Sequence, residues 1–283
     1  MRTNLFSKLP ATAFSVLLAL SLGACGGSSE PAATEDTSAQ TTEATEAADA
    51  ATTTDAGTTA ETTSTAADAT AMTYADYAAA AVDDPVTIEA YVQGKQAWWE
   101  NKASLYLQDK DGGYFAFETA CTEDDYAKLT DGIKVKVSGY KGNFNGEDEV
   151  IDGSFVIEDD GDTYVAEAVD VTDKLGSDEL VNYMNQKVAF TGLTVAASED
   201  PDGNEVAFLY NYDGSGSQGD DLYFNVSDGT NTYSFTVESY LCDKDSDAYK
   251  AVEALKVGDT VDLEGFLYWY EGANPHITKV TVK

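Results

Sequence analysis

One segment of this chain is written twice, and this repeat constrains the fold more than any other feature of the sequence. The first copy runs from Ser104 to Glu118 and the second from Asp221 to Glu238. In both copies apolar and polar residues alternate on either side of a turn that contains glycine, which is the pattern of a β-hairpin. Repetition on this scale indicates two copies of one folding unit.

The residues around the two hairpins repeat in the same order. A helical stretch and a first strand precede each hairpin, and a cysteine (Cys121 or Cys242), a short acidic helix and two more strands follow it. These elements cover residues 74–81, 86–92, 122–129, 131–140 and 150–157 in the first copy, and 178–186, 188–195, 246–255, 257–266 and 276–282 in the second. The order in each copy is therefore helix, three strands, helix and two strands.

This layout resembles the OB-fold, and the fourth strand, Gly-x-x-Val-x-Val/Leu-x-Gly, resembles that of bacterial OB domains. The resemblance implies a mainly β protein with two tandem five-stranded OB-like barrels over residues 73–172 and 173–283. Each barrel would have a short helix between strands 3 and 4. Gly139 and Gly265 stand in mid-strand, where we expect the sharp bend of a small closed barrel. The fold does not determine the ligand.

The N-terminus carries the parts of an export signal. Arg2 and Lys8 precede an apolar run over residues 13–20, which is too short to span a bilayer, and small residues follow. The sequence Leu22-Gly23-Ala24-Cys25 resembles the lipobox of bacterial lipoproteins. The resemblance implies that residues 1–24 are a signal peptide and that acyl chains on Cys25 anchor the protein to the cell membrane, on its extracytoplasmic side. The alternative is a secreted protein in which this cysteine is incidental.

Residues 25–72 have a different composition from the rest of the chain. From residue 26 onward they are rich in Ala, Thr, Ser, Glu and Asp, and they contain no Lys, Arg or aromatic residue. Such a segment cannot bury enough apolar surface to offset its chain entropy, so we predict a disordered tether. A glycosylated stalk or a linker without a tuned length is the alternative.

The charge of the chain bears on its partners. The formal net charge is −35, and residues 73–283 alone contain 42 acidic and 14 basic residues. Affinity for phosphate groups depends mostly on Lys and Arg, and Lys134 and Lys136 are the one clear basic pair on a predicted strand. We therefore do not expect nucleic acid as a partner, although OB domains commonly bind it, and keep nucleic-acid binding as an alternative function.

Aromatic residues gather where an OB barrel presents its loops. In the second copy, alternation places Val261, Leu263 and Gly265 in the core and turns the intervening residues outward. Exposed rings can stack on sugars or peptide side chains, with carboxylates as hydrogen-bond acceptors. In the alternative, these rings close the barrel ends or form an interface between the barrels. The predicted ligand-binding residues are Trp98, Trp99, Tyr140, Phe144, Phe266, Tyr268 and Tyr270.

The sequence offers little for catalysis or metal binding. His276 is the one histidine, and it belongs to no defensible acid–Ser–His order. The carboxylate clusters do not fit the EF-hand loop, and the glycine-rich stretch 213–221 lacks the Gly-Lys-Ser/Thr ending of a phosphate loop, so we expect solvated turns. We predict no enzyme, no cofactor and no metal site. Cys121 and Cys242 are either two unpaired thiols or a bridge between the domains.

These observations predict a lipid-anchored, non-catalytic binding protein at the cell surface. Its expected partners are the membrane, through the acyl chains on Cys25, and an extracellular small ligand, oligosaccharide, peptide or protein. The alternatives are a structural partner in an envelope complex, in which the aromatic rings are buried, and an OB-fold protein that binds nucleic acid.

Overall fold

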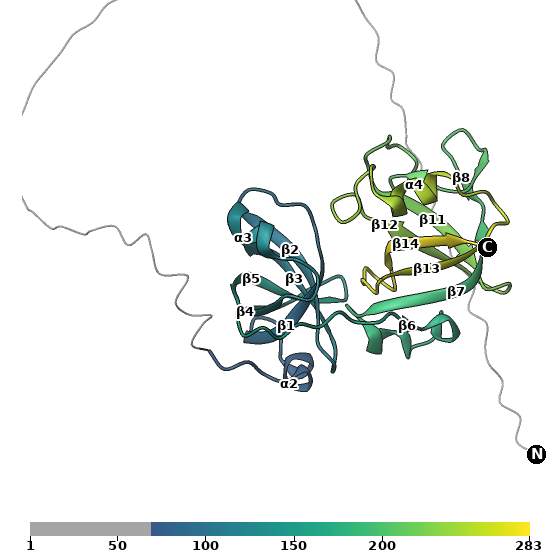
Figure 1. Ribbon diagram of the computed structural model, residues 1–283. Coiled ribbons are helices and arrows are strands. Elements are labelled where there is room, and N and C mark those ends of the chain that lie inside the picture. Colours follow the sequence, from purple (N-terminus) through teal and green to yellow (C-terminus); the bar gives the residue numbers. More distant parts are fainter. Residues whose placement is uncertain (1–68) are drawn as a thin grey trace, which may run out of the picture. The chain divides into compact units, whose positions relative to one another are not determined.

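The computed structural model of this protein describes residues 69–283 (Figure 1). The predicted signal peptide, Cys25 and the tether as far as residue 68 lie outside the described residues. Within the described range, no helix combines the length and the apolar character that crossing a membrane would require.

The first repeat folds into a closed barrel. The strands are β1 (Pro85–Lys95), β2 (Lys102–Gln108), β3 (Gly113–Ala120), β4 (Lys134–Phe144) and β5 (Glu147–Ile157), and they pair in the order β1-β2-β3-β5-β4. The helices are α2 (Tyr74–Ala79), which precedes the barrel, and α3 (Glu123–Lys128), which lies between β3 and β4 in the chain. The prediction of a five-stranded barrel with this helix position is confirmed.

The second repeat forms a similar ring with additions. Its strands are β7 (Lys187–Ala196), β11 (Leu222–Ser227), β12 (Thr232–Val237), β13 (Thr260–Phe266) and β14 (His276–Val282), with α4 (Asp247–Glu253) between β12 and β13. Pairing of β11 with β7 closes the ring. The shorter elements are β6 (Val169–Asp170), β8 (Ser198–Glu199), β9 (Glu205–Val206), β10 (Leu209–Tyr210), η1 (Thr172–Lys174) and η2 (Leu180–Tyr183). The mainly β fold with two closed five-stranded barrels is thus confirmed.

The two short helices begin as their sequences predict. The side chains of Thr122 and Ser246 cap α3 and α4 by accepting hydrogen bonds from the amides of Asp125 and Tyr249. The segment 178–186 differs, because only the 3-10 turn η2 forms where we predicted a helix. Asn185 adopts a left-handed φ of 64°, which reverses the chain before a longer helix can form.

Each barrel has its own apolar core. Ile88, Leu105 and Val137 are fully buried in the first core, and Phe190, Phe224 and Leu263 in the second. These side chains come from the inward positions of alternating strands. Cys121 and Cys242 are both free cysteines, so the structure contains no bridge between them.

The mid-strand glycines bend the barrels as predicted. The register of β4 against β5 shifts at Gly139, and that of β13 against β14 shifts at Gly265. A Cβ atom on Gly265 would lie 2.1 Å from the carbonyl oxygen of His276, closer than any real contact. The fourth strands can therefore curve around the barrel only because these positions carry no side chain.

Candidate ligand-binding site

The second barrel places an aromatic ring on the first. Phe266, at the end of β13, stacks on Tyr106 of β2 with ring centroids 4.3 Å apart and planes within 10°. With Phe115 they form a small buried cluster. The prediction that Phe266 faces outward to a ligand is therefore wrong. The alternation does turn the ring of Phe266 out of its own barrel, but the first barrel covers it. This agrees with the alternative in which these rings form an interface between the barrels.

A hydrogen bond beside this stack joins β2 to β14. The hydroxyl of Tyr106 lies 2.7 Å from Nδ1 of His276, the first residue of β14. Burial lowers the pKa of His276 to about 3, so its imidazole is neutral near pH 7. The ring of Tyr268 stacks on the imidazole of His276, with ring centroids 4.4 Å apart. Tyr268 also lines a cavity.

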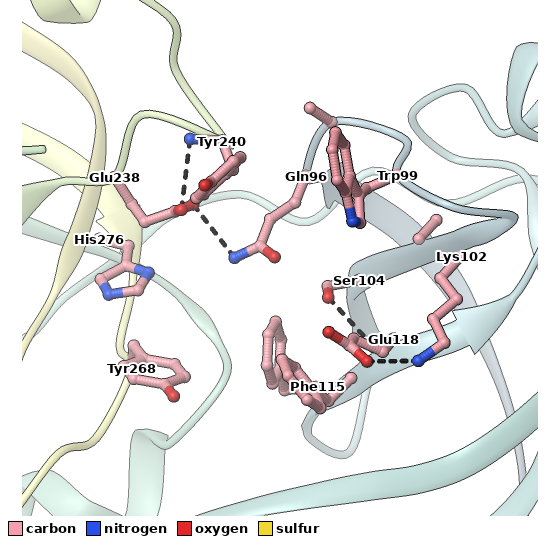
Figure 2. Close-up of a pocket in the computed structure, with 13 residues that line it drawn as sticks. Gln96, Trp99, Lys102, Ser104, Phe115, Glu118, Glu238, Tyr240, Tyr268 and His276 are labelled. Atoms are coloured by element: carbon pink, nitrogen blue, oxygen red, sulfur yellow. Dashed lines mark hydrogen bonds and ion pairs between the residues drawn. The ribbon is translucent and has the colours of Figure 1, made fainter. Parts of the chain in front are cut away.

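This cavity is the candidate site (Figure 2). It has a volume of about 530 Å³, within the range of small-molecule sites. The loop between β1 and β2 and strands β2 and β3 form one wall, and residues around β12 and β14 form the other. The lining residues that matter below are Gln96, Trp99, Lys102, Phe117, Glu118, Glu238, Tyr240, Tyr268 and His276.

Three rings line the cavity without being covered by other side chains. Trp99 is 68% exposed, Tyr240 is 66% exposed and Phe117 is 40% exposed. The amide of Ala97 donates to the carbonyl oxygen of Tyr240 at 2.7 Å, so the loop that carries Trp99 is tied to the loop that carries Tyr240. Large exposed rings held on opposite walls of one cavity are available to stack on a ligand.

Glu238 is the carboxylate at the centre of this arrangement. It is only 8% exposed, and it accepts hydrogen bonds from Nε2 of Gln96 and from the amide of Tyr240 (Figure 2). Burial, together with the nearby charge of Asp221, raises the pKa of Glu238 to about 7. Near pH 7 the carboxyl group of Glu238 is therefore present in both its protonated and its ionised form.

The other charges of the cavity neutralise each other. Nζ of Lys102 lies 2.6 Å from Oε2 of Glu118, across the hairpin of β2 and β3. Both side chains are about half exposed, so this ion pair contributes little to stability. Among the charged residues that line the cavity, Glu238 is the one without an oppositely charged partner.

The similarity of this chain to known proteins lies in solved structures. No protein-family model matches the sequence, and no curated protein matches it. Similar solved structures include the Ifi202 HINa domain in complex with 20bp dsDNA, at 11% identity and a TM-score of 0.31 over 71% of this chain and 96% of that chain. The p204 HINb domain has 10% identity and a TM-score of 0.33 over 71% and 98%. A Replication Protein A heterotrimer bound to ssDNA has 12% identity and a TM-score of 0.29 over 71% and 49%.

These structures correct one prediction from the sequence. We did not expect nucleic acid as a partner, on the ground of the acidic charge, yet the similar structures include domains solved with double-stranded or single-stranded DNA. The exclusion of nucleic acid is therefore withdrawn. The likeness itself concerns the arrangement of strands, and what those proteins bind is a statement about those proteins.

The other predicted site residues are divided among several places. Trp98 packs against the first core and donates from Nε1 to the carbonyl oxygen of Cys121 at 2.8 Å. Tyr140 and Phe144 are exposed on β4 and do not line the cavity. Of the seven predicted rings, the structure brings Trp99 and Tyr268 together in the cavity. Phe144 instead lies 5.8 Å from Tyr270, ring to ring.

Tyr270 lines a second groove on the second barrel. This groove has a volume of about 390 Å³ and also contains Tyr212 and Tyr223, of which Tyr212 is largely exposed. It lies over β11 and β12 and the loops that flank them. Among the residues that the structure describes, no group of three His, Cys, Asp or Glu side chains is placed to hold a metal ion.

Sequence reasoning missed the residues that give the cavity its charge. Glu118 and Glu238 end the two copies of the repeated hairpin, so the alignment of the repeat contained a signal for both. Phe117 directly precedes Glu118 in the first copy of the hairpin. No local signal in the sequence shows that His276 contacts the other barrel.

A further pair of carboxyl groups is buried near this contact. Glu147 is fully buried, and its Oε2 accepts from the amide of Trp269 in the second barrel at 2.7 Å. Burial raises the pKa of Glu147 to about 8 and that of Glu149 to about 7. The carboxyl group of Glu147 that accepts from Trp269 is therefore mostly protonated near pH 7.

Proposed function

We propose that this chain is a non-catalytic binding protein that holds its ligand in the cavity lined by Trp99, Tyr240 and Glu238. The observation that carries the proposal is the presence of two largely exposed rings and one buried carboxylate around a single cavity. Large exposed rings gathered around one cavity are typical of an interaction or ligand-binding site. A ligand that offers apolar or ring faces together with hydrogen-bond donors fits this lining, as a peptide or an oligosaccharide does.

We further propose that the protein works at the cell surface on a lipid anchor. The support is the sequence Leu22-Gly23-Ala24-Cys25 after a short apolar run. More than one acyl chain would hold the protein stably at the membrane. Intact-mass measurement of the protein from its native membrane tests this step. A mass without acyl groups on Cys25, or a Cys25→Ala variant that stays in the membrane fraction, contradicts it.

Binding to the cavity is tested with a ligand panel and two matched variants. Glycans and short peptides are screened against the protein, and each hit is titrated again with Tyr240→Ala and with Tyr212→Ala. Both tyrosines are largely exposed, but only Tyr240 lines this cavity. We expect loss of about tenfold or more in affinity for Tyr240→Ala, because a stacked ring contributes on the order of 1 kcal/mol or more. Equal affinities for the two variants would remove the basis of the proposal.

Single-stranded nucleic acid is the second candidate. The exposed rings of Trp99 and Tyr240 could stack on bases, which is how many proteins bind single strands without sequence preference. Lys102 is the one basic residue that lines the cavity, and it is paired with Glu118. A labelled oligonucleotide titrated at several salt concentrations decides the matter. Binding that weakens steeply with salt and is lost in Trp99→Ala supports this candidate, and no binding at low salt rejects it.

A further inference from the structure

We propose that the cavity binds an organic ammonium group, with Glu238 as its counter-ion and the rings of Trp99 and Tyr240 as the faces that contact its methyl or methylene groups. This inference rests on the proposed function and adds the charge and the chemical class of the ligand. Four observations carry it: the burial and partners of Glu238, the pairing of the other charges, the exposed rings, and the charge of the domain.

The first observation is that Glu238 is buried without a basic partner. In the described part of the chain, no ion pair includes this residue. Its carboxylate accepts from an amide side chain, Gln96, at 3.1 Å and from the amide of Tyr240 at 3.2 Å. Neutral donors offset only part of the cost of burying a carboxylate. A cation in the cavity would supply the missing charge.

The second observation is that the basic residue of the cavity is already engaged. Lys102 is the one Lys or Arg in the lining, and its ammonium group lies 2.6 Å from Glu118. With this pair neutralised, an anionic ligand would meet Glu238 without compensation. Because its one unpaired charged group is the carboxylate of Glu238, the cavity favours a cation over an anion.

The third observation concerns the rings. Trp99 and Tyr240 are both about two-thirds exposed, and Phe117 adds a third open ring. Figure 2 shows Tyr240 beside Glu238, with Trp99 across from them on the other side of Gln96. The face of an aromatic ring attracts a cation, most strongly when the cation is a methylated ammonium group with little hydration to lose.

The fourth observation is the charge of the folded region. Residues 73–283 contain 42 acidic and 14 basic residues. A protein with this net charge raises the local concentration of cations and speeds their arrival at a cavity that carries the same sign. The long-range field and the unmatched carboxylate therefore act in one direction.

The site depends on both barrels. Gln96 and Trp99 come from the loop after β1, whereas Glu238 and Tyr240 follow β12. The hydrogen bonds from Gln96 to Glu238 and from Ala97 to Tyr240 hold the two sides together. The test therefore uses the full chain with both barrels present.

The experiment compares choline with its neutral carbon isostere, in which a tert-butyl group replaces the trimethylammonium group. Both probes are titrated into the protein while tryptophan fluorescence and heat of binding are followed. We expect choline to bind about tenfold or more tightly than the isostere, which corresponds to roughly 1.4 kcal/mol for one cation–π contact with charge pairing. Glu238→Gln should reduce choline affinity toward that of the isostere, because the rings still attract the cation, and it should leave binding of the isostere unchanged.

Matched controls separate the possible failures. Glu199→Gln removes the same charge at an exposed position outside this cavity, so it should leave choline affinity within about twofold if only the long-range field changes. Retained isostere binding by Glu238→Gln shows that the variant is folded. Equal affinity for the two probes, no binding of either, or choline affinity unchanged in Glu238→Gln overturns the inference. The proposed function stands in those cases if a panel ligand still loses affinity in Tyr240→Ala.

Discussion

The ring of Phe266 stacks on the ring of Tyr106 at 4.3 Å, and both side chains are buried although each points out of its own barrel. Gly94 lets the ring of Phe266 approach closely, because a Cβ atom at this position would lie 2.8 Å from that ring. Gly113 fits a second point of contact, where a Cβ atom would lie 2.4 Å from the backbone of Asn185. The outward faces of the two repeats are thus shaped to meet, and the cavity lies at the margin of that contact.

We expect Phe266→Ala to destabilise the folded protein by roughly 3–5 kcal/mol, since a buried aromatic ring and its stacking partner are lost. Urea denaturation followed by circular dichroism measures the change. Phe144→Ala is the control, because Phe144 is about half exposed and its loss should cost less than about 0.5–1 kcal/mol. Similar costs for the two variants would show that the stack contributes nothing special to stability.

Stability should fall as the pH rises from about 5 to about 8. The pKa of Glu147 is 4.5 in the unfolded chain and about 8 in the folded protein, because burial disfavours its charged form. The unfolded chain therefore releases this proton first, and the stability present below pH 4.5 is lost as the pH rises through the folded pKa. Glu149 and Glu238, with a pKa of about 7, act in the same direction.

Urea denaturation at intervals across this pH range measures the slope. Glu147→Gln should flatten it by up to about 1.4 kcal/mol per pH unit, the value for one proton. A neutral amide has nothing to ionise, so the residual slope should come from Glu149 and Glu238 and, below about pH 6.5, from the opposite contribution of His276. A slope that is the same in the variant would contradict the burial of a protonated Glu147.

His276 should not titrate in the folded protein between about pH 5 and pH 8. Burial lowers its pKa from 6.5 to about 3, so the stability it contributes is present above pH 6.5 and is lost as the pH falls toward 3. His276 is the one histidine of the chain, so its ring protons give an unambiguous NMR signal. A titration with a midpoint near 6.5 in the folded state would mean that the imidazole is open to water.

Most of the quencher-accessible tryptophan emission should come from Trp99. This side chain is 68% exposed, whereas Trp98 packs against the first core and donates a hydrogen bond to Cys121. Acrylamide quenching should therefore drop strongly in Trp99→Phe and change little in Trp98→Phe. The opposite ranking would place Trp98 rather than Trp99 at the cavity.

Much of the architecture followed from short-range patterns. Alternation located the strands, and the short acidic segment 246–255 located α4, because strand faces and helix starts depend on neighbouring residues. The exception was residues 178–186, where the left-handed backbone at Asn185 ended a predicted helix after one turn. Local propensity does not reveal such a reversal.

The sequence by itself determined two repeated barrels and the side of each strand that faces its own core. Only the tertiary structure decided that Phe266 is covered, that Trp99 is open, and that Glu238 lies between rings from two repeats. The physical reason is that alternation records a side chain's direction relative to its own sheet. What covers the outward face depends on residues more than a hundred positions away, such as Tyr106, whose contact with Phe266 leaves no periodic signal in either strand.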